Sequence, residues 1–195
     1  MTEKEKMIAQ QLYDANYDDE LELERLECKA LCQEYNNLPI KDLKSRGELI
    51  KKILGKTGEN IHIEPDFWCD YGYQIKVGEN FYANHGLVIL DAGGVIFGDN
   101  VFIAPSCGFH TSGHPIDFER RNKGLEYAYS IKVGNNVWFG AGVQVMPGVT
   151  IGDNVVKGGG SGMVKDIPSN SVAVGNPCKV IREITKEDEQ KCWNR

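Results

Sequence analysis

The 195-residue sequence predicts a mainly β fold of the hexapeptide β-helix type, and three observations carry that prediction. Apolar residues recur every six positions over 131–167, which is neither the period of a helix nor that of a plain strand. A second apolar set follows two positions later, so each repeat corresponds to a short strand and a turn. Most of the 22 glycines lie between Gly55 and Gly175, where repeated turns need positive φ. The two sets are Ile131, Val137, Val143, Val149 and Val155, and Val133, Phe139, Val145 and Ile151.

Residues 1–58 predict a helical subdomain that precedes the coil. Thr2 and Glu5 match a capping box at the start of the first helix. In the second helix, Leu23, Leu26 and Ala30 recur at three- and four-residue spacing and are expected to form the apolar stripe. So short a segment cannot build a large core alone, so it should pack on the coil. The expected helices cover residues 2–13, 18–35 and 42–54.

The coil is predicted over 59–179, and its six-residue period is interrupted twice. At 91–94 the phase slips by two residues, which indicates a bulge that re-aims a side chain. Over 110–130 the repeat stops, and Ile131 resumes it 24 residues after Cys107, a multiple of six. The segment 110–130 is therefore expected to be a loop ejected from the coil. Long loops on a rigid scaffold usually carry function.

The carboxyl-terminal part of the chain contains two departures from the repeat. Lys157 and Ser161 lie where inward apolar residues are expected, so Lys157 should either extend its amine to solvent or lie on a bulged turn. Residues 180–195 are expected to form a capping tail, helical up to Trp193, that protects the open end of the coil.

Composition and charge limit the classes of function. The net charge of −6 argues against nucleic-acid binding. The charged first residues and the lack of an apolar run of about 18 residues predict a cytoplasmic protein without membrane contact. Six cysteines without a framework spacing fit free thiols. Cys28 and Cys32 would share a helix face, but no second pair completes a zinc set, so no metal is expected.

Two histidines lie at the root of the ejected loop, His110 and His114. Histidine is the most common general base because its pKa is close to working pH, although a structural hydrogen bond is an equal alternative here. A Ser-His-Asp triad is not supported, because no serine has nucleophile-elbow spacing. The four histidines do not share a six-residue phase, so they do not predict a metal site.

Six segments, in order along essentially the whole chain, resemble the maltose and galactoside O-acetyltransferases. The resemblance implies a left-handed parallel β-helix and a homotrimer with active sites between subunits. It also implies transfer of acetyl from acetyl-coenzyme A to a sugar hydroxyl. The segments are 80–84 (NFYAN), 111–115 (TSGHP), 131–138 (IKVGNNVW), 147–154 (PGVTIGDN), 165–168 (KDIP) and 175–182 (GNPCKVIR).

The same resemblance implies that His114 is the general base. An alcohol attacks a thioester poorly until a base takes its proton, so direct transfer in a ternary complex without a protein nucleophile is the natural hypothesis. The thioester oxygen becomes negative during attack, and backbone N–H groups near Gly140 and Ala141 are candidate donors to it.

Acceptor contacts are implied at Asn16, Asp70 and Asn84, and Asn84 should also contact the cofactor. Asn84 could instead be a turn residue of the coil. The family's substrate aspartate aligns with Ala92, so Asp91 is expected to take its role, and the acceptor preference stays open.

Coenzyme A is implied along one edge of the coil, with its phosphates at the carboxyl-terminal end. Arginine suits bidentate phosphate contact and lysine acts as a point charge. The alternative is a solvated basic face. The positions implied are Ala141, Gly159, Val164, Lys165, Lys179 and Arg182.

Three other functions remain open for this chain. The first is a hexapeptide acyltransferase with an amine or an antibiotic hydroxyl as acceptor. The second is a zinc-dependent carbonic anhydrase on the same coil, which the histidine positions disfavour. The third is a non-catalytic scaffold, since a fold alone does not imply a function.

Overall fold

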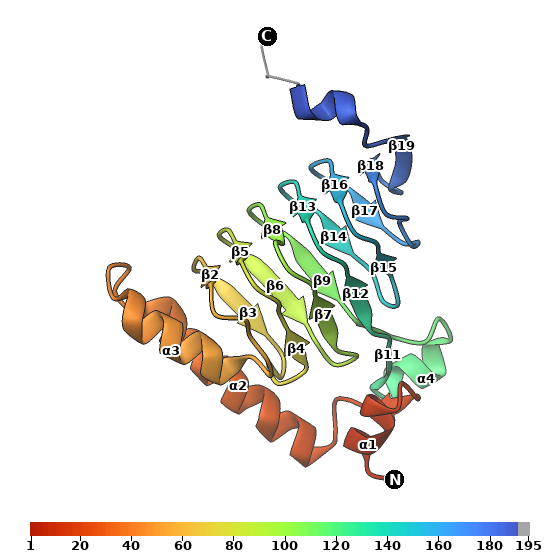
Figure 1. Ribbon diagram of the computed structural model, residues 1–195. Helices are drawn as coiled ribbons and strands as arrows, with labels where there is room; N and C mark the ends of the chain where they lie inside the picture. Colours follow the sequence, from red (N-terminus) through yellow and green to blue (C-terminus); the bar gives the residue numbers. More distant parts are fainter. Residues whose placement is uncertain (191–195) are drawn as a thin grey trace.

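The computed structural model describes residues 1–190 and confirms a parallel β-helix with helices packed at its amino-terminal end (Figure 1). Successive strands of the coil belong to three different sheets, so the sheets form three walls around one core. No helix in this part of the chain is long and apolar enough to cross a membrane.

The first wall has seven strands, the second five and the third four. All pairs within the walls are parallel except the last pair of the first wall. The seven strands are β2 (Ile61–Ile63), β5 (Phe81–Ala83), β8 (Phe102–Ile103), β13 (Val137–Phe139), β16 (Val155–Lys157), β18 (Ser171–Val174) and β19 (Lys179–Glu183). The five are β3 (Phe67–Cys69), β6 (Leu87–Leu90), β9 (Gly108–His110), β14 (Gln144–Val145) and β17 (Gly162–Met163). The four are β4 (Ile75–Lys76), β7 (Val95–Phe97), β12 (Ile131–Val133) and β15 (Thr150–Ile151).

The residues that recur every six positions fill the coil. All nine members of the two predicted apolar sets are buried. Phenylalanine rings stack edge to face through the centre, with centroids 4.9–5.1 Å apart, an arrangement that aromatic pairs prefer. These rings belong to Phe81, Phe97, Phe109 and Phe139.

Asparagine forms the corners of the coil where the chain takes positive φ. Its short polar side chain tolerates this conformation better than most residues. At successive corners the side-chain amides hydrogen-bond to one another, as from Asn80 to Asn100 at 2.9 Å and from Asn154 to Asn170 at 2.9 Å. The positive-φ corners are at Asn80, Asn100, Asn136, Asn154 and Asn170.

The amino-terminal helices differ in part from those expected. The capping box of Thr2 and Glu5 is present, but the first helix is short, and a two-residue strand replaces its predicted end. The second and third helices begin after Asp18 and Asp42, whose side chains accept backbone N–H bonds. The elements are α1 (Glu3–Ile8), β1 (Tyr13–Asp14), α2 (Asp19–Asn37) and α3 (Leu43–Ile53).

The buried face of α2 is not the predicted one. Leu23 and Leu26 are 58% and 57% exposed, so the leucine stripe was wrong. The face toward the coil carries Leu21, Cys28, Cys32 and Tyr35. Cysteine behaves as a small hydrophobe in such a layer, so leucine spacing alone selected the wrong face.

The ejected loop is held in place by strand pairing with the amino-terminal segment. It contains β10 (Ser112–Gly113), α4 (Phe118–Asn122) and β11 (Leu125–Ala128). Strand β11 pairs antiparallel with both β1 and β10, which makes a three-stranded sheet outside the coil. In Figure 1, α1 and α4 accordingly lie close together beside the coil. Because three strands hold the loop, its residues have defined positions.

The carboxyl-terminal tail was expected to be helical, but it begins with a β-strand. Strand β19 pairs antiparallel with β18 and covers the open edge of the seven-stranded wall, which protects an otherwise unpaired edge. A 3-10 helix follows at Lys186–Gln190. Trp193, the predicted end of the helix, lies outside the described residues.

Lys157 points into the coil, contrary to the expectation that its amine would reach solvent or lie on a bulge. It pairs in register with Phe139 and Ala173 and is 1% exposed. Its Nζ has no hydrogen-bond partner within residues 1–190. Burial lowers the pKa of Lys157 to about 8. Ser161, by contrast, is satisfied, because its hydroxyl donates to the Gly158 carbonyl and accepts from the Gly175 amide.

Replacing the buried amine should stabilise the protein. We expect Lys157→Met to raise the free energy of unfolding by about 1–4 kcal/mol at pH 7, because an unpaired buried charge is removed. The folded pKa lies below the unfolded value of 10.5, so wild-type stability should rise between pH 8 and pH 10.5 while the unfolded chain binds the extra proton. Urea unfolding should show that the difference in unfolding free energy between Lys157→Met and the wild type is smaller at pH 10 than at pH 7. A gap independent of pH would contradict this explanation.

Candidate functional site

A polar cavity of about 370 Å³ lies where the amino-terminal segment, α2, the turn after β3 and the ejected loop meet. It brings together three predicted residues that are far apart in sequence, Asn16, Asp70 and His114. Such a cavity, with a few converging polar groups, is the usual form of a small-molecule site. The other lining residues are Tyr13, Ala15, Arg25, Lys29, Tyr71, Leu90, Ala92, Ser112, Gly113 and Glu126.

His114 follows β10, and β11 fixes its imidazole. Nδ1 lies 3.0 Å from the carbonyl oxygen of Leu125. A carbonyl only accepts, so this bond places the proton on Nδ1 and leaves the lone pair of a neutral ring on Nε2. The side chain is 44% exposed and borders the cavity. Nε2 can therefore accept a proton from a molecule bound there.

Glu126, on β11, lines the same cavity and lies on the Nε2 side of the imidazole. Its Oε1 is 3.6 Å from Nε2 of His114, and its Oε2 accepts a hydrogen bond from the Tyr13 hydroxyl at 3.0 Å. Burial raises the pKa of Glu126. When ionised, this carboxylate would stabilise the imidazolium that forms when His114 takes up a proton.

Asp70, directly after β3, provides a second carboxylate in the lining of the cavity. Burial raises the pKa of Asp70, while the charges of Lys29 and Arg25 oppose the rise. Arg25 donates to the Tyr71 hydroxyl at 2.8 Å and to the Ala15 carbonyl at 2.7 Å, so α2 holds this wall in place. The cavity thus contains both cations and carboxylates, a mixture suited to a ligand with many hydroxyl groups.

Asp91 lies beneath the cavity wall and does not line it. Its side chain is buried at the turn that interrupts the coil, and Oδ1 accepts from the amides of Asp70 and Tyr71 at 3.0 and 2.9 Å. Oδ2 has no partner within residues 1–190. Burial raises the pKa of Asp91 to about 7. Ala92 lines the cavity instead, so in the isolated chain Asp91 positions the backbone around Asp70.

Asn84 lies away from His114 in a single chain. It lines a second depression, of about 420 Å³, on the seven-stranded wall, together with the aromatic rings of Phe102 and Trp138. Its Oδ1 accepts from the amide of His85 at 2.8 Å. The isolated chain therefore does not bring all the predicted site residues together.

The predicted cofactor positions follow the coil toward its carboxyl-terminal end. Ala141 and Gly159 occupy stacked corners, joined by the Gly160 amide donating to the Ala141 carbonyl at 2.8 Å. A Cβ at Gly159 would lie 3.1 Å from that carbonyl oxygen, so the backbones approach closely there. Val164, Lys165 and Lys179 are exposed farther along. Arg182 is exposed too, but Asp188 accepts two bonds from its guanidinium, at 2.8 and 3.0 Å.

Sequence comparisons agree with this architecture from end to end. The maltose acetyltransferase hexapeptide capping motif matches residues 6–58, and the bacterial transferase hexapeptide model, with six repeats, matches residues 130–162. The galactoside O-acetyltransferase of Escherichia coli K12 is 47% identical over 165 residues, which cover 85% of this chain and 81% of that protein. The chain belongs to the maltose and galactoside O-acetyltransferase family.

Solved structures of this family share the whole fold, helices included. A maltose O-acetyltransferase from Clostridium difficile 630 has a TM-score of 0.92 at 49% identity, covering 95% of this chain and 99% of its own. A galactoside acetyltransferase in complex with coenzyme A has a TM-score of 0.94 at 42% identity, covering 100% of this chain and 96% of its own. This member of the family is therefore an acetyltransferase.

Several residues of the cavity escaped the sequence reasoning. Glu126, Tyr13 and Arg25 reach it through contacts between segments far apart in the chain, such as the pairing of β1 with β11. The one local signal is the alternation of Leu125, Tyr127 and Tyr129 in the loop, which fits a strand whose other face would carry Glu126.

Proposed function

We propose that this acetyltransferase moves acetyl from acetyl-coenzyme A to a hydroxyl group of a sugar such as maltose, glucose or a galactoside. The observation that carries the proposal is the fixed tautomer of His114, whose Nε2 borders a polar cavity. The mixed charges of Asp70, Arg25 and Lys29 around that cavity suit a neutral ligand with many hydroxyls. The cytoplasm is the expected compartment, in keeping with the buried free cysteines.

The reaction is a direct transfer in a ternary complex. Nε2 of His114 takes the proton of the attacking hydroxyl as its oxygen bonds to the thioester carbonyl carbon. The carbon–sulfur bond then breaks, and the imidazolium returns its proton to the leaving thiolate. Glu126 stabilises the imidazolium in between. The Gly140 amide already donates to the Lys157 carbonyl at 2.9 Å, so the Ala141 amide is the proposed donor to the carbonyl oxygen as it becomes negative.

Acceptor contacts in this proposal come from two walls of the cavity. Asp70 and Asn16 bind sugar hydroxyls directly, whereas Asp91 acts through the amides of Asp70 and Tyr71. Ala92 leaves room where a larger polar residue would reach the ligand. The acceptor preference of this chain is therefore set mainly by Asp70 and Asn16.

Acetyl-coenzyme A is proposed to lie along the corners formed by Ala141 and Gly159 and past Val164. Two relatives support this cofactor: the galactoside acetyltransferase was solved with coenzyme A, and a hexapeptide-repeat acetyltransferase from Vibrio cholerae, 30% identical with a TM-score of 0.87, with acetyl-coenzyme A. The close backbone approach at Gly159 leaves little room for a side chain, which keeps the edge open to the pantetheine arm. Lys165, Lys179 and Arg182 would meet the phosphates.

Removing two of these cations should weaken cofactor binding selectively. We expect Lys179→Ala combined with Arg182→Ala to raise KM for acetyl-coenzyme A at least about tenfold, because charge-assisted bonds to phosphate are lost. KM for the sugar should change little. The matched control is Lys44→Ala with Lys51→Ala, two exposed lysines of α3. Steady-state kinetics with each substrate varied would measure this, and an unchanged KM for acetyl-coenzyme A would refute the phosphate contact.

We further propose that the chain works as a homotrimer through the seven-stranded wall. The outward side chains of this wall form an apolar row in which Tyr82, Phe102 and Trp138 are in register. Phe102 and Trp138 are each 50% exposed. An apolar patch of this kind marks an interaction surface. Joining this wall to the cavity of a neighbouring subunit would bring Asn84 toward His114.

Release of free thiol from acetyl-coenzyme A tests the proposed reaction. We expect turnover with maltose, glucose or galactosides, and acetylation of the sugar confirmed by its mass. Turnover only with amines or with an antibiotic hydroxyl would instead support the second acceptor class. Hydrolysis of the thioester at the same rate with and without sugar would contradict a sugar transferase.

A further inference from the structure

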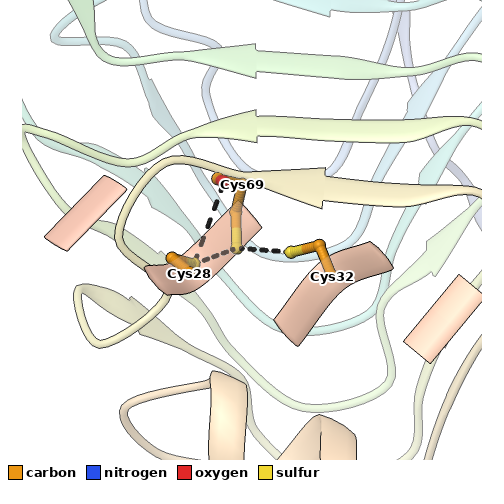
Figure 2. Close-up of side chains that lie close together, drawn as sticks. All are labelled: Cys28, Cys32 and Cys69. Carbon is orange, nitrogen blue, oxygen red and sulfur yellow. Dashed lines mark hydrogen bonds between the residues drawn. The ribbon is translucent and has the colours of Figure 1, made fainter. Parts of the chain in front are cut away.

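Three cysteine side chains meet in the buried layer between α2 and the first turn of the coil (Figure 2). Cys28 and Cys32 lie one turn apart on α2, and Cys69 ends β3. The Sγ atom of Cys69 lies 3.5 Å from that of Cys28 and 3.7 Å from that of Cys32. All three sulfurs lie within 4.8 Å of one another and are buried. From the sequence, only Cys28 and Cys32 were expected to lie together, on one helix face. Cys69 completes the group from a distant strand.

We propose that Cys28, Cys32 and Cys69 form a binding site for a thiophilic d¹⁰ cation, Zn²⁺ or Cu⁺. Thiolates at about 2.3 Å from one metal ion lie roughly 3.8–4 Å from one another, so the observed spacing needs only a small adjustment. Soft sulfur donors select such cations over Mg²⁺ or Ca²⁺. Nothing in the proposed acetyl transfer uses these thiols.

The three thiols exchange hydrogen bonds with one another. Metal ligands must be thiolates, so a bound cation would take the place of the protons that these thiols share. All three cysteines are buried, which limits the access of water and oxidants to bound thiolates.

A buried carboxyl group, that of Asp91, lies near the cluster. Asp91 interacts electrostatically with both Cys28 and Cys69, and its Oδ2 has no hydrogen-bond partner within residues 1–190. Its Oδ1 binds the amides of Asp70 and Tyr71, immediately after Cys69. Asp91 therefore fits the outer shell of a cation site, where carboxylates orient and support the ligands.

One edge of the cluster borders a cavity at the surface. Cys28 lines this separate cavity, of about 230 Å³, between α2, α3 and the turn after β3. Glu24, Glu27 and Lys52 line the same cavity. Because the Glu24 carboxylate pairs with Lys4, a positive ion at the entrance would be attracted chiefly by Glu27.

Binding would cross-link two parts of the fold. Cys28 and Cys32 belong to the helical subdomain, whereas Cys69 belongs to the coil and precedes Asp70 in the cavity wall. A ligand that binds only the folded state stabilises it in proportion to the logarithm of its concentration. The cation should thus raise the thermal midpoint of the protein.

Titration of the reduced, metal-free full chain with Cd²⁺ tests the site directly, because thiolate-to-metal charge transfer absorbs in the ultraviolet. We expect the band to saturate at about one ion per chain, and Zn²⁺ or Cu⁺ to displace Cd²⁺, which is measured as Cd²⁺ released into solution. The ion that displaces Cd²⁺ at the lower free concentration is the preferred one. Absence of a saturable band in the folded wild type would overturn the proposal, whatever the variants do.

Two variants test whether the absorption band comes from the three clustered cysteines. Cys69→Ser should remove it, or shift its saturation at least about tenfold in Cd²⁺ concentration, because one of three thiolates is lost. The matched control is Cys107→Ser, which removes a buried thiol bonded to the Gly140 carbonyl at 3.3 Å, outside the cluster. Circular dichroism and the thermal midpoint without metal would verify that both variants fold. Equal losses of the band in Cys69→Ser and Cys107→Ser would contradict the assignment.

Discussion

His114→Ala should lower kcat by about 10²-fold or more, the contribution that a positioned general base usually makes. The reason is geometric: the Leu125 carbonyl fixes the proton on Nδ1 and leaves Nε2 to accept the hydroxyl proton at the cavity. KM for acetyl-coenzyme A should change little, because the proposed cofactor edge lies elsewhere on the coil. Thiol release measured with the best sugar acceptor would determine both parameters.

The matched control is the other histidine at the root of the loop. His110 lies at the end of β9 and contacts Oε1 of Gln144 at 2.8 Å through Nε2, and it does not line the cavity. His110→Ala should therefore keep kcat near the wild-type value. Full activity in His114→Ala, or an equal loss in both variants, would refute the assignment of the base.

Phe102→Glu combined with Trp138→Glu should dissociate the protein into monomers and abolish measurable transfer. Both side chains are half exposed on the seven-stranded wall, so the substitutions do not disturb the core. Each would place a carboxylate in an apolar interface, where an unpaired charge is costly to desolvate. A monomer would leave Asn84 and His114 in separate depressions. Light scattering and thiol release on the same sample would measure both effects.

A second wall of the coil offers the control for this pair. Ile96 is 42% exposed on the four-stranded wall, where its neighbours in register are Lys76 and Lys132. Ile96→Glu likewise introduces a carboxylate at a half-exposed apolar position, but on a polar surface. The trimer and the activity should therefore persist. An active monomer of the double variant would contradict a site shared between subunits.

The regular part of the fold could be predicted because each turn repeats the same local rule. Inward residues such as Val137 and Phe139 follow the six-residue period and are buried as expected. Lys157 follows the six-residue period although it is not apolar, because the strand register holds its side chain inside the coil, where its Nζ has no hydrogen-bond partner among the described residues 1–190. The α2 stripe was wrong because the buried face uses cysteines, which hydrophobic spacing of leucines does not reveal.

The candidate site could be predicted only in part, because it depends on contacts between distant segments. His114 and Asp70 were expected from family motifs, and the structure brings them to one cavity. Glu126 reaches His114 because β11 pairs with β10 within the loop, and no local pattern specifies that register. Tyr13 reaches Glu126 because β11 also pairs with β1, more than a hundred residues away. Cys69 joins the α2 cysteines for the same reason.

The central claim is that acetyl transfer uses His114 of one subunit with Asn84 of its neighbour, and mixed trimers test it most directly. His114→Ala and Asn84→Ala would each be inactive, but every trimer containing both variants would hold one site with both residues intact. Random assembly of equal amounts predicts recovery of about a quarter of the wild-type activity. We expect that recovery after co-expression and purification through two tags. Activity no higher than that of the two parent variants would contradict the shared site.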